Sequence, residues 1–140
     1  MVPLRPRCLD RLALVFRRWQ RFRHCKGPIG ANTIRNGAQV VVPPILPMEI
    51  GNVLIRAEKT GQIDQARKKA FLSALAGMSI TINEDASRRA LSNTLEIAES
   101  RNLTTYDAPY LELAAFEKTP LATLDAKLSK AATRSGLVVL

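Results

Sequence analysis

The chain has 140 residues, about one ordinary domain, and its 46% hydrophobic content argues against global disorder. Its net charge of +9 suggests at first an acidic partner such as nucleic acid or a membrane surface. However, residues 1–36 hold nine basic residues and one acid, a net of +8, whereas residues 37–140 hold 12 and 11, a net of +1. The excess charge therefore belongs almost wholly to the first quarter of the chain.

Composition also argues against several other classes of protein. No apolar run approaches the ~18–20 residues that span a bilayer, and the uncharged stretch 12–16 is too short for the core of a signal peptide. Two cysteines, Cys8 and Cys25, form neither a disulfide framework nor a zinc site, so a reduced cytoplasmic setting is expected. With His24 as the single histidine, any catalysis is expected to use carboxylates.

From residue 37 onward, strand and helix patterns alternate. Asp64 and Gly77 are typical of the start and the end of a helix. In chain order the pattern predicts a strand at 39–42, helices at 45–60 and 64–76, a strand at 78–82, helices at 85–100 and 106–118, a strand at 121–123, a helix at 125–135 and a strand at 137–140. This alternation predicts an α/β fold with a parallel sheet covered by helices.

Glu49 lies in a strongly apolar helix that we expect to be buried on most sides. A carboxylate in such a helix needs a partner or a metal ion. The alternative is a partly exposed side chain paired with Arg56.

Two further acids lie at predicted helix starts. Asp107 shares a helix face with Leu111, and Thr104 or Thr105 could cap that helix. Asp125 follows the predicted strand 121–123 and begins the next helix. Each acid has a simpler explanation, since Asp107 could serve the helix dipole and Asp125 could be an ordinary N-cap.

Taken together, Glu49, Asp107 and Asp125 favour a shared site, because ligands bind at the carboxyl ends of parallel strands. Converging carboxylates repel one another unless a cation neutralises them. Oxygen-only ligand sets select Mg²⁺ or Mn²⁺, and such an ion can activate water for phosphodiester hydrolysis.

Three motifs resemble the PIN domain, in particular the VapC toxins of bacterial VapBC toxin–antitoxin modules. They are Val-Pro-Pro-Ile-Leu-Pro-Met-Glu-Ile-Gly-Asn-Val-Leu at 42–54, Leu-Thr-Thr-Tyr-Asp-Ala-Pro-Tyr-Leu-Glu-Leu-Ala at 103–114 and Pro-Leu-Ala-Thr-Leu-Asp-Ala-Lys-Leu at 120–128. The resemblance covers about residues 38–140 and implies an α/β/α sandwich with a central parallel sheet. It also implies a metal-dependent ribonuclease toxin of a type II toxin–antitoxin system.

The resemblance implies specific roles for residues and partners. Asp107 would be a direct ligand of Mg²⁺ or Mn²⁺, and Asp125 and Glu49 would complete the acidic cluster. Thr123 and Asn52 would orient carboxylates or water. The implied partners are an RNA substrate, a VapB-like antitoxin that covers the site, and a second copy of the chain, with no membrane.

The beginning of the chain departs from the family pattern of a hydrophobic strand that ends in Asp. Asp10 is the only candidate for this metal ligand, and Pro6 and Arg7 stand where a buried strand should be apolar. The first strand is therefore in doubt. The sequence divides into an atypical basic segment, 1–36, and a PIN-like domain, 37–140.

Three interpretations of residues 1–36 stay open. The segment could be a basic arm that binds RNA phosphates, with Trp19 or Phe22 stacking on bases, or a solvated, partly disordered extension. The hypothesis we prefer is a shifted reading frame or a misassigned start, which the genomic sequence would test.

These interpretations lead to two hypotheses of function from different classes. The first is a Mg²⁺-dependent ribonuclease toxin. The second is a catalytically impaired PIN-like module that binds an antitoxin without cleaving RNA, because a lost first acid would remove a metal ligand. A DNA-binding role led by the basic segment finds no support in a helix-turn-helix signature.

Overall fold

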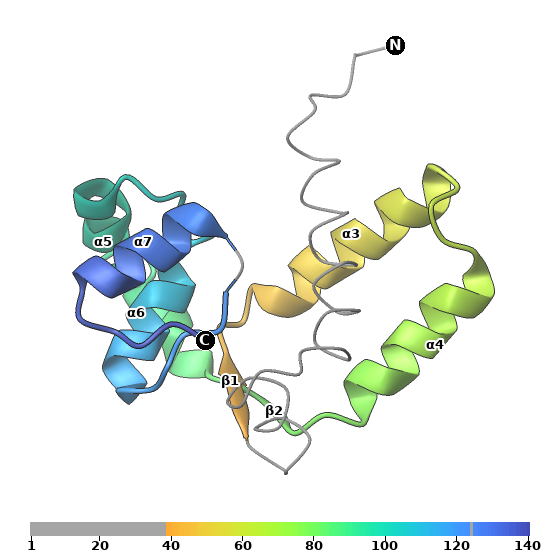
Figure 1. The fold of residues 1–140 in the computed structure, drawn as a ribbon, viewed down its shortest axis with the longest axis horizontal. Helices are drawn as coiled ribbons and strands as arrows, with labels where there is room; N and C mark the ends of the chain where they lie inside the picture. The colour runs from red at the N-terminus through yellow and green to blue at the C-terminus, as the bar shows by residue number, and fades with distance from the viewer. Residues whose placement is uncertain (1–38, 124) are drawn as a thin grey trace. The chain divides into compact units, whose positions relative to one another are not determined.

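The computed structural model describes residues 39–123 and 125–140, and Figure 1 labels their helices and strands. The described residues belong to two compact units. One contains Pro47–Ser79, and the other contains Gln39–Leu46 and Ile80–Leu140. Asp10 and the rest of the basic segment 1–36 lie outside the described residues.

The first unit is a pair of helices, α3 (Leu46–Lys59) and α4 (Gln65–Ala76). The expected cap of the second helix is confirmed, because an Asp64 carboxylate oxygen accepts a hydrogen bond from the backbone N–H of Arg67 at 2.7 Å. The turn between the helices contains Gly61 at φ +69°, a conformation that a side chain would strain. The two helices share a small apolar core of Leu54, Ala57, Ile63 and Phe71, with Ile50, Val53 and Leu75 packed against it.

Helix α3 is less buried than its sequence suggests. Its buried side chains are Leu54 and Ala57, whereas Met48 is 71% exposed and Ile55 is 53% exposed. The expectation of burial on most sides was therefore wrong. Apolar side chains on the other faces of this helix do not guarantee burial, because apolar residues also occur on protein surfaces.

The second unit contains two short parallel strands, β1 (Val40–Val42) and β2 (Ile80–Ile82), with Val40 opposite Ile80 and Val42 opposite Ile82. The β-branched residues of both strands suit this pairing. The predicted strands at 121–123 and 137–140 are reduced to one parallel bridge between Leu121 and Val139. The predicted α/β fold with parallel pairing is confirmed.

The predicted helix 85–100 is two elements in the structure. A 3₁₀ segment, η1 (Glu84–Arg89), begins after Asn83, whose side-chain oxygen accepts from the backbone N–H of Ala86 at 3.1 Å. A new helix, α5 (Asn93–Arg101), follows Ser92, whose φ of −125° and ψ of −104° are not helical. The prediction of one continuous helix was therefore wrong. The apolar period continues through Ser92, where the backbone conformation is not helical.

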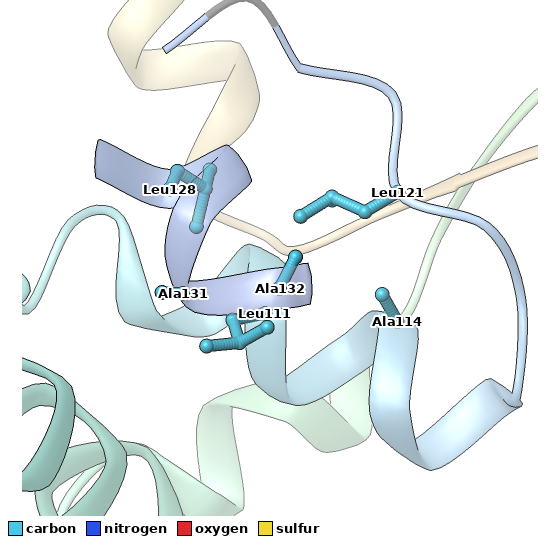
Figure 2. Close-up of a cluster of buried hydrophobic side chains, with 6 residues drawn as sticks. All are labelled: Leu111, Ala114, Leu121, Leu128, Ala131 and Ala132. Atoms are coloured by element: carbon cyan, nitrogen blue, oxygen red, sulfur yellow. The ribbon is translucent and has the colours of Figure 1, made fainter. Parts of the chain in front are cut away.

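Helices α6 (Ala108–Glu117) and α7 (Ala126–Arg134) contribute most of the core of this unit. Figure 2 shows the buried cluster that joins them with the segment around Leu121. Its members are Leu111, Ala114, Leu121, Leu128, Ala131 and Ala132. Within the described part of the chain, no helix is both long and apolar enough to cross a membrane.

We expect Leu111→Ala to lower the free energy of unfolding by about 2–5 kcal/mol, because Leu111 is 2% exposed and its truncation leaves a cavity in this cluster. Urea denaturation followed by circular dichroism measures the change. Leu91→Ala is the matched control, since Leu91 is 89% exposed and its loss should stay within about 0.5 kcal/mol. Equal effects of the two variants would contradict the placement of Leu111 in the core.

Candidate metal centre

Asp107 lies at the start of α6, where a turn leads into the helix. The backbone carbonyl of Thr104 accepts hydrogen bonds from the backbone N–H groups of Asp107 at 3.1 Å and Ala108 at 2.9 Å. Pro109 lies in the first turn, where its missing N–H costs no helix hydrogen bond. The local sequence therefore places the Asp107 carboxylate at the positive end of the helix dipole.

The hydroxyl of Thr104 contacts Asp107 twice. It donates to carboxylate oxygen Oδ2 at 2.7 Å, and it accepts from the backbone N–H of the same residue at 3.1 Å. The Asp107 side chain makes no capping hydrogen bond to the helix backbone. Of the two threonines that the sequence left open, Thr104 is the one whose hydroxyl bonds to the helix start.

Asp125 begins α7. Its carboxylate oxygen Oδ1 accepts from the backbone N–H of Leu128 at 2.8 Å. Asp125 is therefore the N-cap of α7, as the simpler explanation of this acid predicted. Its own backbone N–H donates to the hydroxyl of Thr123 at 3.1 Å. Thr123 is 8% exposed. A buried hydroxyl therefore accepts the hydrogen bond from the residue that begins α7.

The two aspartates precede the same core. Asp107 lies four residues before Leu111 and Asp125 lies three residues before Leu128, and both leucines belong to the cluster of Figure 2. Each acid is thus about one helical turn from that core, at the N-terminal end of its helix. Both belong to one compact unit of the chain.

The remaining predicted ligands are placed differently. Glu49 is partly buried in the first turn of α3 and belongs to the other unit, while Asp10 lies outside the described residues. Among residues 39–123 and 125–140, no group of three or more Asp, Glu, His or Cys side chains is arranged to hold a metal ion. The donor types nevertheless fit a hard cation, since Asp107 and Asp125 offer carboxylate oxygens and Thr123 a hydroxyl.

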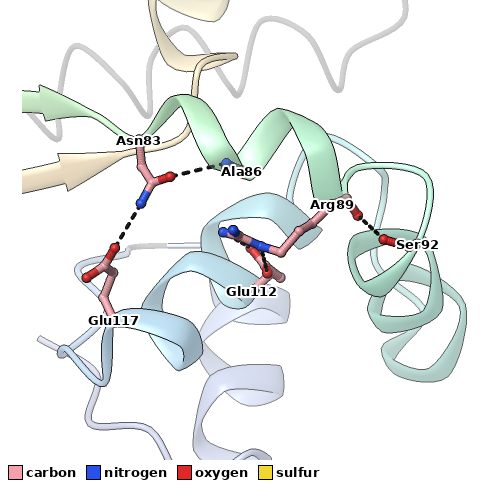
Figure 3. Close-up of polar contacts among 6 residues, drawn as sticks. All are labelled: Asn83, Ala86, Arg89, Ser92, Glu112 and Glu117. Carbon is pink, nitrogen blue, oxygen red and sulfur yellow. Dashed lines mark hydrogen bonds and ion pairs between the residues drawn. The ribbon is translucent and has the colours of Figure 1, made fainter.

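A buried ion pair on α6 was not anticipated from the sequence. Figure 3 shows the guanidinium of Arg89, at the end of η1, against the carboxylate of Glu112. Arg89 Nε donates to Glu112 Oε1, and Nη2 donates to Oε2 at 3.2 Å. The side chain of Glu112 is 4% exposed and that of Arg89 is 18% exposed. The signal in the sequence was a single acid within the apolar run 111–114.

Two further contacts support this pair. The guanidinium carbon of Arg89 lies 4.2 Å from the ring centroid of Phe116, a cation–π geometry. The hydrogen bond to Glu112 raises the pKa of Arg89 above its ordinary value, since it stabilises the charged guanidinium. The bidentate contact therefore ties η1 to α6 as a charged pair.

Asn83 connects η1 with the end of α6. Its side-chain amide donates to Glu117 Oε1 at 2.8 Å while its oxygen caps η1, and Figure 3 shows both contacts. Asn83 directly follows β2, and its backbone N–H donates to the carbonyl of Val42 at 2.9 Å. One residue therefore links the ends of both parallel strands to the helix that begins with Asp107.

The described residues form an α/β fold with parallel strand pairing, and two of the candidate acids begin helices of one unit. Residues 22–134 match the PIN domain, and the chain belongs to this family. PIN domains are typically nucleases, so membership of the family supports nuclease activity in general, without a defined substrate or metal.

Among solved structures, the chain is similar to the crystal structure of PAE2754 from Pyrobaculum aerophilum, at 22% identity and a TM-score of 0.63. The similarity covers 86% of this chain and 82% of that one, and it shows a shared fold. No curated protein matches the chain significantly.

Proposed function

We propose that this protein is a Mg²⁺- or Mn²⁺-dependent endoribonuclease and the toxin of a type II toxin–antitoxin system of the VapBC kind. Membership of the PIN family supports the nuclease class. The observation that carries the proposal is that Asp107 and Asp125, two of the acids that the resemblance gives to the metal, begin two helices that share one core.

In this proposal each acid has a defined task. Asp107 would hold the cation directly, and Asp125 would hold it while one of its carboxylate oxygens caps α7. Thr123 keeps Asp125 in place through its backbone N–H. Glu49 and Asp10 are the other acids that the resemblance assigns to the metal. When bound, the cation supplies Lewis-acid activation of the attacking water and stabilises negative charge on the phosphodiester.

The partners follow from the same resemblance. RNA is the substrate, a VapB-like antitoxin covers the site, and the chain acts in the cytoplasm as a homodimer. An antitoxin that covers the acids would keep both the cation and the RNA away from them. Release from the antitoxin would then switch on cleavage.

We expect the full-length protein to cleave structured RNA with Mg²⁺ or Mn²⁺, to lose this activity in excess EDTA and to regain it when Mg²⁺ is restored, because the acids hold the ion reversibly. Gel analysis of a labelled tRNA substrate measures the products. A DNA strand of the same sequence is the control for substrate class.

Two outcomes would contradict the proposal. Cleavage that persists in excess EDTA would exclude metal dependence. No cleavage with either ion would contradict nuclease activity of this chain and would instead favour the impaired, antitoxin-binding module.

A further inference from the structure

Thr104 holds the Asp107 carboxylate against the backbone of the same aspartate. Its hydroxyl donates to Oδ2 at 2.7 Å and accepts from the Asp107 N–H at 3.1 Å. Because one hydroxyl makes both contacts, the torsion of the aspartate side chain is tied to the helix start. Thr104 is itself anchored, since its carbonyl accepts from the N–H groups of Asp107 and Ala108.

The geometry exceeds what a helix cap requires. A cap needs only an acceptor for a backbone N–H at the helix start, and the Asp107 N–H has two, the Thr104 carbonyl and the Thr104 hydroxyl. Donation of the hydroxyl proton to Oδ2 adds a second bond, which directs the carboxylate and does nothing for the helix backbone. Groups that hydrogen-bond a ligating carboxylate in this way commonly set its orientation and the affinity for the metal.

We infer that Thr104 is a positioning residue that orients the Asp107 carboxylate for binding of the divalent cation. This inference rests on the proposed function, in which Asp107 is a ligand. Thr104 has no direct contact with the cation in this role. Its hydroxyl restricts the aspartate to one arrangement, so that less side-chain freedom is lost when the ion binds.

Titration calorimetry of Mn²⁺ into the full-length protein tests the inference without an activity assay. We expect Thr104→Val to raise the Mn²⁺ dissociation constant by about 10–100-fold, the usual effect of removing a group that supports a metal ligand. Thr104→Ser keeps the hydroxyl, so it should bind within about threefold of the original chain. Thr105→Val is the matched control, because it makes the same change at the adjacent exposed threonine.

The outcomes separate this inference from the proposed function. If the original chain binds Mn²⁺ and Asp107→Asn does not, while Thr104→Val binds as tightly as the original chain, the inference alone is overturned. If the original chain binds no Mn²⁺, or Asp107→Asn binds it unchanged, the proposed function and the inference fall together. Circular dichroism verifies the fold of each variant, and Thr104→Ala replaces Thr104→Val if the latter does not fold.

Discussion

RNA cleavage is expected to fall by roughly 10²–10³-fold when Asp107 is replaced by Asn. A direct carboxylate ligand supports several kcal/mol of charge stabilisation in the transition state, and each 1.36 kcal/mol corresponds to about tenfold in rate. Asn keeps the size of the side chain and can still accept the hydrogen bond from Thr104. Single-turnover cleavage of a labelled RNA by the full-length protein measures the rate.

Asp85→Asn is the control for this experiment. Asp85 is an acid of the same unit, but its side chain is 69% exposed and its Oδ1 lies 3.7 Å from Arg88 Nε in a surface ion pair. The identical chemical change there should leave the rate unchanged within about twofold. Cleavage that survives in Asp107→Asn would remove Asp107 from the proposed metal centre.

Arg89→Met is expected to lower the free energy of unfolding by about 3–5 kcal/mol. The substitution leaves the Glu112 carboxylate, 4% exposed, buried without its bidentate partner. It also removes the cation–π contact with Phe116. Urea denaturation at neutral pH measures the loss.

Two variants show whether the buried charge causes this loss. Arg88→Met changes the neighbouring arginine, whose side chain is 86% exposed, and should cost no more than about 0.5 kcal/mol. The double variant Arg89→Met/Glu112→Met removes both charges and should recover most of the stability, since apolar residues of similar size often replace a buried pair without loss. A double variant no more stable than Arg89→Met would point to lost packing instead.

Local signals in the sequence predicted most helix boundaries. Asp64 and Asp125 begin helices as expected, because an Asp side chain can accept from a backbone N–H two or three residues onward wherever it occurs. Pro109 in the first turn of α6 follows from a second local rule, since a residue without an N–H costs no helix hydrogen bond there. Such signals need no knowledge of the rest of the fold.

The break between η1 and α5 could not be predicted in this way. Residues 85–100 have an apolar period compatible with one helix, and the structure divides them at Ser92. The first part is held by the contacts of Arg89 with Glu112, which is 23 residues away in the sequence. A contact between residues so far apart in the sequence can override the local preference for a helix. It leaves no periodic pattern in the sequence by which it could be predicted.

In the candidate site, too, some features follow from local sequence and others from tertiary contacts. The sequence by itself determined that Asp107 and Asp125 begin helices, because turn residues and caps act over three or four positions. Only the tertiary structure decided that Leu111 and Leu128, one turn further along those helices, share a core, and that Glu112 is paired with Arg89. The +9 charge gave no guidance, since it lies almost wholly in residues 1–36, whereas burial and pairing depend on which distant side chains meet.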